Sequence, residues 1–304
     1  MIIAITGGTG FVGSSLSLRH TKLGDEVRVL SRKIELKSKN VTHFFGDLSD
    51  PKINLSEFLN GVDILYHCAG EINDKSSMHK LHVDGTQRLV DKAIGNVGRW
   101  IQLSSVGVYG KYRKGVVTEN SLEKPFGIYE QTKNKSDQIV INSGIPYVIV
   151  RPSNIFGKDM TNQSLKQLVQ AVRKGRFFFI GKKNEFMVNY IHLDDVVSVL
   201  MLCNADKKAE GEIFILSQSI SVKDMIKSFA LDTQTIKNFL NLPEFLVRAL
   251  VTIFEIVPKF PLTNSRIDAL TNKCIYSSKK LHNTLKFDHS ITLEERFKLF
   301  AKQK

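Results

Sequence analysis

The sequence predicts an α/β fold in which a doubly wound parallel sheet is followed by a smaller, mixed α/β lobe. Short, fully apolar segments alternate with stretches long enough for a helix throughout the first half of the chain. A glycine-rich turn follows the first of these segments directly. Strands that are buried on both faces read as continuous apolar runs, and helical crossovers keep successive strands parallel.

Six apolar segments of the first half are expected to form the sheet. They are residues 2–5, 27–30, 43–45, 63–67, 100–103 and 147–150. Helices are expected between some of them, over 78–94 and 129–142. Together these elements predict a first domain over residues 1–152.

The pattern loosens after Arg151 and Pro152, where a second lobe is expected over 153–304 with no flexible linker before it. Its predicted elements are a strand at 213–216 and helices at 164–174, 194–203, 243–256 and 293–301. Pro243 suits the first turn of its helix, where a backbone N–H has no partner to lose. Residues 188–204 are expected to return to the sheet of the first domain.

Length and composition are those of an ordinary globular chain. The 304 residues are 42% hydrophobic and 24% charged, near globular averages, which excludes a disordered chain. The best candidate for a membrane span, 245–257, is interrupted by Arg248 and Glu255 and falls short of the roughly 20 residues needed. The first apolar stretch is too short for a signal peptide. We therefore expect a cytoplasmic protein with no membrane partner.

The chain is strongly basic and poor in cysteine. Its 43 Lys and Arg against 30 Asp and Glu give a formal charge of +13, which either steers phosphate-bearing ligands or forms a solvated basic surface. The lysines are scattered, so no nucleic-acid partner is expected. Cys68, Cys203 and Cys274 are far apart and predict neither a disulfide framework nor a metal site.

A phosphate-binding turn is predicted between the first strand and the helix after it. The segment reads TGGTGFVG, with glycines at Gly7, Gly10 and Gly13. Glycines permit a tight turn and let backbone N–H groups approach a pyrophosphate, and a helix beginning near Phe11 points its positive end at that charge. A strand before the turn, a helix after it and a second strand about 20 residues later match the dinucleotide fingerprint of a Rossmann-type fold.

The end of the second strand bears on the choice between NAD and NADP. An acidic residue there would bind the adenosine ribose of NAD, whereas Arg32 can neutralise the 2′-phosphate of NADP. An ordinary exposed pair of Arg32 and Lys33 is the other interpretation. We therefore expect NADP or NAD, with NADP favoured. Asp47, after the third strand, is placed either to touch the adenine or to cap the turn that follows.

Ser105, Tyr129 and Lys133 form the candidate reacting set. Tyr129 and Lys133 are four residues apart, on one face of a predicted helix, and Ser105 follows the fifth strand. The lysine ammonium is expected to favour the phenolate and to lower a tyrosine pKa that starts near 10. Such a tyrosine can move a proton to or from a hydroxyl, while Ser105 hydrogen-bonds the same oxygen. Tyr276 and Lys280 share the spacing, but their place in the second lobe disfavours them.

Taken together, these motifs resemble the extended short-chain dehydrogenase/reductase family, in the branch of NAD-dependent sugar-nucleotide epimerases and dehydratases. The motifs that carry the resemblance are TGGTGFVG, GDL, YHCAG, SSVGVYG, YEQTK, RPSNIFG and VNYIHLDDVV. They follow the family's order and extend over nearly the whole chain. Their combination is specific for the fold and much less specific for the substrate.

The resemblance implies a role for each matching residue. Ser105, Tyr129 and Lys133 would be the catalytic set, and Lys133 would also hold the nicotinamide ribose hydroxyls. Other implied cofactor contacts are Phe11 and Val12 at the pyrophosphate, Asp47 and Leu48 at the adenine, and Cys68, Ala69 and Gly70 at the ribose side. Cys68 is then a packing residue and not a nucleophile. Asn154 would face the diphosphate of the substrate.

Two departures from the family pattern bear on function. His82 stands where many members have Asn, and it either hydrogen-bonds near the cofactor or is a structural histidine with partners of its own. Val106 and Gly107 stand where the family's 4,6-dehydratases carry an Asp-Glu pair and its decarboxylases a Glu. Because elimination and decarboxylation depend on those acids, the sequence favours epimerisation or simple carbonyl reduction.

The resemblance thus favours a sugar-nucleotide epimerase of the UDP-hexose 4-epimerase type, with a UDP-sugar as substrate. The alternative, which Arg32 favours, is an NADPH-dependent reductase of a keto sugar nucleotide or of a non-nucleotide ketone. A binding protein without catalysis is disfavoured because the reacting set is intact. Arg266 is either a phosphate fork for the substrate or an exposed helix arginine. Family members commonly dimerise through two helices, so a homodimer stays an open alternative.

Overall fold

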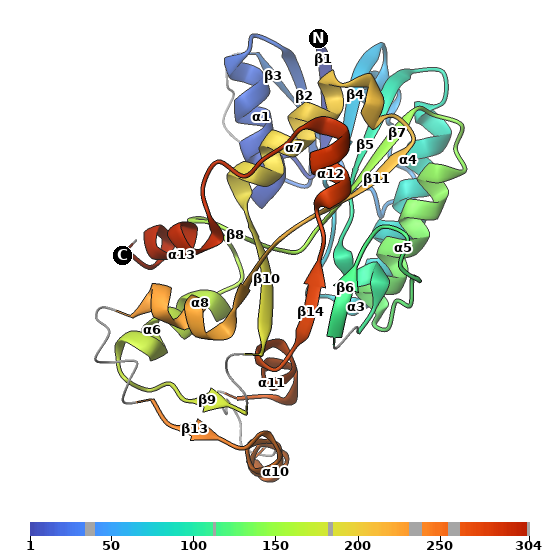
Figure 1. Cartoon of the computed structure of the whole chain (residues 1–304). Coiled ribbons are helices and arrows are strands. Elements are labelled where there is room, and N and C mark those ends of the chain that lie inside the picture. Colours follow the sequence, from blue (N-terminus) through green and yellow to red (C-terminus); the bar gives the residue numbers. More distant parts are fainter. Residues whose placement is uncertain (34–39, 112–113, 182–184, 231–238, 255–261, 303–304) are drawn as a thin grey trace.

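A seven-stranded parallel sheet forms the upper part of the molecule, and a smaller lobe lies below it (Figure 1). The computed structural model describes residues 1–33, 40–111, 114–181, 185–230, 239–254 and 262–302. The strand order is β11-β7-β5-β4-β1-β2-β3, and every neighbouring pair is parallel. The strands are β1 Ile2–Thr6, β2 Glu26–Ser31, β3 Val41–Phe45, β4 Val62–His67, β5 Val97–Leu103, β7 Tyr147–Pro152 and β11 Glu212–Leu216.

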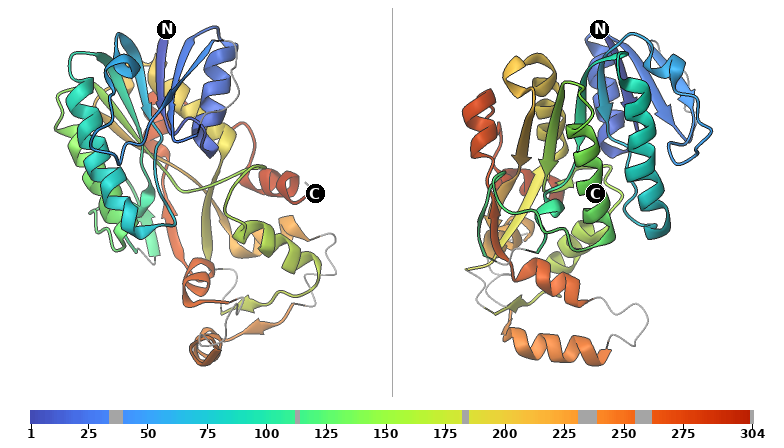
Figure 2. Two further views of the ribbon diagram at one scale, coloured as in Figure 1. Left: turned by 180° about the vertical axis from the view of Figure 1, so that it is seen from behind. Right: turned by 90° about the vertical axis from the view of Figure 1, so that its right-hand side faces the viewer.

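Helices cover both faces of this sheet (Figure 2). Helices α1 (Phe11–Lys22) and α7 (Leu193–Ala205) cover one face. Helices α4 (Thr86–Ala93) and α5 (Ile128–Ile141) cover the other. In β1, Ile3 and Ile5 pack towards α1 and α7, whereas Ala4 packs towards α4. Successive side chains of a strand point to opposite faces. A sheet covered on both sides therefore needs strands that are apolar throughout.

The carboxyl ends of the strands all meet at one edge of the sheet, because the strands are parallel. The turn after β1, the segments after β2 and β3, and the loops after β4 and β5 therefore lie along this edge. In doubly wound folds, ligands bind in the crevice outside the carboxyl ends of the strands. This edge faces the smaller lobe (Figure 1).

The smaller lobe is built from short strands and helices around an aromatic core. Phe156 lies 4.9 Å from Phe297 and 5.7 Å from Phe300, measured between ring centroids. Its strands are β8 Asn154–Phe156, β9 Phe179–Ile180, β10 Met187–His192, β12 Gln218–Ser221 and β13 Asn241–Leu242. Its helices are α6 Ser164–Arg173, α8 Val222–Phe229, α10 Glu244–Phe254, α11 Asn264–Leu270 and α13 Leu293–Lys302. Within the described ranges, no helix has the length and hydropathy that a bilayer crossing requires.

Further short elements connect these parts. Strands β6 (Lys114–Val117) and β14 (Lys273–Tyr276) form a two-stranded parallel ribbon beside the main sheet. The remaining elements are helices α2 Ser56–Leu59, α3 Lys75–His79 and α12 Lys279–Leu285, the π-helical turn η1 Lys80–Gly85, and the 3₁₀ turns η2 Val106–Tyr109 and η3 Lys207–Ala209.

The predicted fold class is confirmed, and three details differ from the sequence expectations. The strand at 213–216, expected in the second lobe, is β11 at the edge of the main sheet, where Glu212 pairs with Val148. Residues 188–204, expected to return to that sheet, divide into two. Strand β10 pairs with β8 and β12 instead, and only α7 lies against the main sheet. The helix expected over 78–94 is a run of α3, η1 and α4.

Candidate functional site

The glycine turn after β1 is close-packed in the way a dinucleotide requires. Gly7 has a φ of +66°, and a Cβ there would lie 2.8 Å from the Ala69 backbone. A Cβ on Gly13 would lie 2.3 Å from the Gly7 carbonyl oxygen. The Gly10 N–H donates to that same oxygen at 2.9 Å. Side chains at Gly7 and Gly13 would force the turn open, so these glycines hold the backbone at the sheet edge.

The start of α1 provides free backbone donors at this turn. The helix begins at Phe11 with Gly10 as its N-cap, no side chain caps it, and its first turn holds no acidic residue. The first N–H groups of a helix have no partner within it, and the helix dipole adds positive charge there. The N–H groups of Phe11 and Val12 therefore fit the diphosphate of a dinucleotide.

A cavity of about 420 Å³ lies at the ends of β2 and β3, where the adenosine is expected. Its lining is Arg32, Phe45, Gly46, Asp47, Asp50, Ile53 and Asn54. Arg32 is exposed. Backbone hydrogen bonds, first that of Asn73, lower the pKa of Glu71, and the charge of Arg32 adds to this effect. The Asp47 carboxylate accepts hydrogen bonds from the N–H and the hydroxyl of Ser49, at 2.8 and 2.7 Å. Asp47 thus caps the turn, while its neighbour Leu48 is buried.

The loop after β4 is tied to the glycine turn. Thr6 Oγ1 hydrogen-bonds buried His67 Nδ1 at 2.6 Å and accepts the Ala69 N–H at 3.3 Å. This places Ala69 beside Gly7, while a Cβ on Gly70 would lie 3.6 Å from His82 Nε2. Burial raises the pKa of the Cys68 thiol to about 12, so the thiol stays protonated at neutral pH. That state suits a packing residue and not a nucleophile.

His82 is a fully hydrogen-bonded histidine in the π-helical turn η1. Its Nε2 accepts the Glu71 N–H at 2.9 Å, and its Nδ1 lies 2.8 Å from the Thr132 hydroxyl. Thr132 in turn donates to the Tyr129 carbonyl oxygen at 3.0 Å. Burial lowers the pKa of His82 to about 3, so the ring is neutral and donates through Nδ1. His82 therefore joins the loop after β4 to the first turn of α5.

Ser105 and Tyr129 form a hydroxyl pair at the carboxyl edge of the sheet. The Gly107 N–H donates to Ser105 Oγ at 3.1 Å, which leaves the serine proton free to be donated. A hydrogen bond from Ser105 acts to lower the pKa of Tyr129, but burial of the phenol and the negative charge of Glu130 outweigh it and raise that pKa to about 12. The phenol is thus protonated at neutral pH.

The expected lowering of the Tyr129 pKa by Lys133 is therefore wrong for this structure. Lys133 is buried, and its ammonium donates to the Leu103 carbonyl oxygen at 2.6 Å. Burial lowers the pKa of Lys133, while Asp137 one turn further along α5 acts in the opposite direction. The ammonium is held at the end of β5, and its charge does not offset the burial of the phenol.

A buried ion-pair network on the helix of the reacting set was not predicted from the sequence. Arg151 donates to Asp137 Oδ2 through Nε at 3.2 Å and Nη2 at 3.1 Å, and to the Tyr109 hydroxyl at 3.0 Å. Glu123 lies 2.6 Å from its Nη1. Arg151 and Asp137 are both fully buried. The network joins β7, α5 and η2, and so fixes the helix that carries Tyr129 and Lys133.

Glu130 was also missed as a site residue. A Cβ on Gly107 would lie 2.8 Å from Glu130 Cγ and 3.3 Å from Ser105 Oγ, and a Cβ on Gly127 would lie 2.3 Å from Glu130 Oε2. The glutamate side chain thus covers both glycines, next to the hydroxyl pair. This acid comes from α5, whereas residues 106 and 107 are a valine and a glycine.

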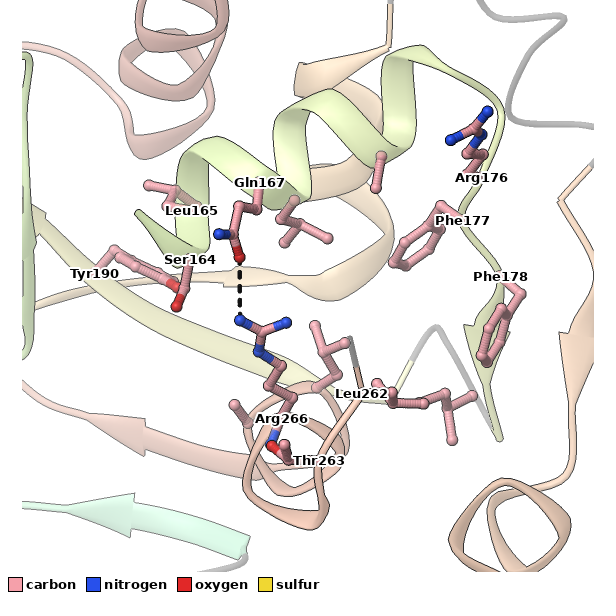
Figure 3. Close-up of a pocket in the computed structure, with 15 residues that line it drawn as sticks. Ser164, Leu165, Gln167, Arg176, Phe177, Phe178, Tyr190, Leu262, Thr263 and Arg266 are labelled. Atoms are coloured by element: carbon pink, nitrogen blue, oxygen red, sulfur yellow. Dashed lines mark hydrogen bonds between the residues drawn. The ribbon is translucent and has the colours of Figure 1, made fainter. Parts of the chain in front are cut away.

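A pocket of the smaller lobe lies between α6 and α11 (Figure 3). Its volume is about 740 Å³, and its lining is mostly apolar. Arg266 reaches across it from α11, and its Nη2 donates to Gln167 Oε1 at 3.1 Å. Phe177 and Phe178 form part of the wall beyond α6. Asn154 does not line this pocket. It lies in β8, where its amide donates to the Asn189 carbonyl oxygen of β10 at 3.2 Å.

Tyr276, the other tyrosine of the same spacing, lies in β14 and packs against the cluster of Val106 and Tyr109. It is therefore next to the main sheet and not in the outer part of the second lobe. Burial raises its pKa. Its strand belongs to the ribbon with β6, so Tyr276 is not on the helix that carries Lys133.

Known proteins are similar to this chain in sequence. The model of the NAD-dependent epimerase/dehydratase family matches residues 3–216. A 4-hydroxy-2-methyl-3-oxo-4-farnesyl-3,4-dihydroquinoline-1-oxide ketoreductase of Stigmatella aurantiaca is 28% identical over 284 residues, which cover 88% of this chain and 83% of that protein. The UDP-glucose 4-epimerase of Vibrio cholerae is 23% identical, with 98% of this chain and 94% of that protein covered.

Solved structures agree with the fold. The UDP-glucuronic acid 4-epimerase from Bacillus cereus in complex with NAD superposes with a TM-score of 0.75. The alignment covers 100% of this chain and 97% of that chain, at 19% identity. At 19% identity, this superposition shows a likeness of fold alone.

Proposed function

This chain belongs to the NAD-dependent epimerase/dehydratase family, and from that premise we propose that it is a sugar-nucleotide epimerase of the UDP-hexose 4-epimerase type. The observation that carries the proposal is the pair of hydroxyls from Ser105 and Tyr129, on the same sheet edge as the glycine turn. A positioned phenol and the serine hydroxyl that hydrogen-bonds it can manage the proton of a substrate hydroxyl. In this proposal residues 1–152 form the core of the cofactor domain, and 153–304 supply mainly the substrate lobe, apart from β11 and α7, which join the main sheet.

We assign the cofactor, NADP or NAD, to the carboxyl edge of the main sheet. The diphosphate would accept hydrogen bonds from the backbone N–H groups of Phe11 and Val12. Gly7, Gly10 and Gly13 would leave room for it. Further residues assigned to it are Arg32, Asp47 and Leu48 at the adenosine, and Cys68, Ala69 and Gly70 near the ribose. His82 receives a positioning role, because both of its ring nitrogens already have partners.

In this proposal each reacting residue has one task. The nicotinamide supplies hydride exchange at the carbon that bears the hydroxyl. Tyr129 holds or accepts the hydroxyl proton, and Ser105 hydrogen-bonds the same oxygen. Lys133 keeps a cation at the end of β5, where its ammonium already donates to a backbone carbonyl and can hold ribose hydroxyls.

We place the substrate between this edge and the pocket of the smaller lobe. Arg266 offers a guanidinium to a diphosphate, since guanidinium pairs with phosphate through two parallel hydrogen bonds. Phe177 and Phe178 offer ring surface to a nucleobase. Asn154, expected at the diphosphate, would have to exchange its bond to Asn189 for a substrate contact.

A second candidate function is an NADPH-dependent reductase. Arg32 supports it, because this cation lines the cavity expected to hold the adenosine and suits a 2′-phosphate. The mostly apolar lining of the lobe pocket suits a non-nucleotide ketone. The similarity to the Stigmatella ketoreductase also points this way.

Incubation of the purified protein with UDP-glucose or UDP-galactose separates the two candidates. An epimerase should interconvert the two sugars, detected by proton NMR, with no net change in absorbance of the reduced cofactor. A reductase should consume NADPH steadily when a keto substrate is present and form no epimer. The second result would replace the epimerase proposal with the reductase.

Replacing Glu130 with glutamine is expected to lower the pKa of Tyr129. The Glu130 charge contributes to raising that pKa, so its removal makes the phenolate easier to form. When Tyr129 acts as a proton donor, it must be protonated to be active. The loss of activity on the basic side of the pH profile should therefore occur at lower pH in Glu130→Gln than in the wild type. The measurement is the pH profile of kcat/KM, and Glu130→Asp, which keeps the charge, is the control. A basic limb that does not move in Glu130→Gln would contradict the effect.

A further inference from the structure

Phe11 is the residue at which the glycine turn meets the smaller lobe. Its backbone begins α1, and its N–H is one of the two assigned to the cofactor diphosphate. Its side chain packs against the aromatic core of the smaller lobe. The side chain of Val12, the next residue, is buried instead in the core of the main sheet. The backbone and the side chain of Phe11 thus belong to different parts of the molecule.

Gly157 provides the space for the Phe11 ring. It directly follows β8, the strand through which the chain passes from β7 of the main sheet into the lobe. A Cβ on Gly157 would lie 3.2 Å from Phe11 Cζ and 3.3 Å from Leu193 Cβ, at the start of α7. Both distances are shorter than most Cβ contacts in proteins. The missing side chain therefore lets the ring lie close against the backbone that enters the lobe.

The core that receives the Phe11 ring also reaches the wall of the lobe pocket. Leu165 and Tyr190 line this pocket, and both pack in that core. Phe156, the residue before Gly157, lies 5.9 Å from Tyr190 between ring centroids. Protein interiors are close-packed and transmit a shift of one side chain to its neighbours. One layer of apolar side chains therefore connects the ring at the cofactor turn with the pocket wall.

We propose that Phe11 is a positioning residue that couples cofactor binding at the glycine turn to the order of the smaller lobe and of its pocket. Diphosphate binding fixes the first turn of α1 and, with it, the ring that packs into the lobe core. A ligand that orders an element shared by two sites lowers the cost of binding at the second site. Linkage makes the effect reciprocal, so a ligand in the pocket should tighten cofactor binding by the same factor.

Another contact between the lobe and the sheet domain has a different role. Arg296 of α13 donates to Asp194 at 3.1 Å and to Asp195 at 3.5 Å, both on α7. Neither acid is assigned to the cofactor, so this contact holds the lobe in place whether or not the cofactor is bound. Phe11 differs because its own N–H is a donor to the diphosphate. The inference therefore rests on the cofactor site of the proposed function, and not on the identity of the substrate.

Hydrogen–deuterium exchange of the full chain, with and without saturating NAD⁺ or NADP⁺, tests the proposal. In the wild type, the cofactor should slow exchange in the loop after β4, where it binds. It should also slow exchange in α6 and α8 of the lobe by at least about fivefold, the low end of the coupling usual between two sites. Phe11→Ala should keep the protection of the loop and lose that of α6 and α8. Cofactor is added until the loop is fully protected, so that a weaker Kd does not affect the comparison.

Gly157→Ala tests the same contact from the side of the lobe and leaves α1 unchanged. Its new methyl group should displace the Phe11 ring and reduce the protection of α6 and α8. The matched control is Leu18→Ala, which shortens a side chain on α1 that is 57% exposed and should respond like the wild type. Circular dichroism checks that all three variants are folded.

Protection of the loop without protection of α6 and α8 in the wild type would overturn the proposal. A wild-type response in both Phe11→Ala and Gly157→Ala would also overturn it. If neither dinucleotide protects the loop, the cofactor assignment is wrong and this inference falls with it. A failure to turn over UDP-sugars would end the epimerase proposal and leave the exchange result unchanged, so the two proposals are tested separately.

Discussion

Replacing Tyr129 with phenylalanine is expected to lower kcat by about 10²- to 10⁴-fold, the range that one positioned acid–base group contributes. The substitution removes the phenolic oxygen and leaves the ring. The backbone bond from Thr132 to the Tyr129 carbonyl does not involve the phenol, so the first turn of α5 should keep its position. Cofactor binding should therefore change little.

Two measurements check this expectation. Turnover is followed with whichever substrate the UDP-sugar and NADPH assays identify, and the Kd for NADPH and NADP⁺ is measured by fluorescence or calorimetry. Tyr276→Phe is the matched control, because it removes a partly buried phenol from the other segment of the same spacing. Wild-type turnover in Tyr129→Phe would remove this residue from the chemistry and, with it, the proposed function.

Local pattern was enough to predict the framework of the site. The six predicted strands are all present, because a doubly covered parallel strand needs an unbroken apolar run. The glycine spacing predicted the turn for a physical reason that the structure makes explicit at Gly13, whose missing Cβ leaves room for the Gly7 carbonyl. Such requirements act between residues close in sequence, so they are visible in the sequence.

Contacts between distant segments could not be predicted in this way. The edge strand β11 pairs with β7 across more than sixty residues, and Arg151 finds Asp137 only because β7 and α5 pack together. The pKa of Tyr129 was misjudged for the same reason. Sequence spacing showed Lys133 one turn away, but not the burial of the phenol, nor the Leu103 carbonyl that holds the ammonium.

Replacing Arg151 with methionine is expected to lower the free energy of unfolding by about 3–5 kcal/mol, the usual cost of removing one partner from a buried ion pair. Arg151 is 0% exposed, and its guanidinium is the partner of Asp137, Glu123 and the Tyr109 hydroxyl. Without it, the Ser104 hydroxyl, at 2.7 Å, would be the side-chain donor that remains to Asp137 among the described residues. An uncompensated carboxylate in the interior is the source of the destabilisation.

Denaturant unfolding curves measure the effect, and two further variants make it specific. Lys298→Met removes an exposed pair with Glu294 on α13 and should change the free energy of unfolding by less than about 1 kcal/mol. Arg151→Met/Asp137→Leu removes both charges and should recover much of the stability lost by Arg151→Met alone, since apolar residues of similar size can replace a buried pair. If the double variant is less stable than Arg151→Met, the loss comes from packing around the arginine and not from the unpaired charge.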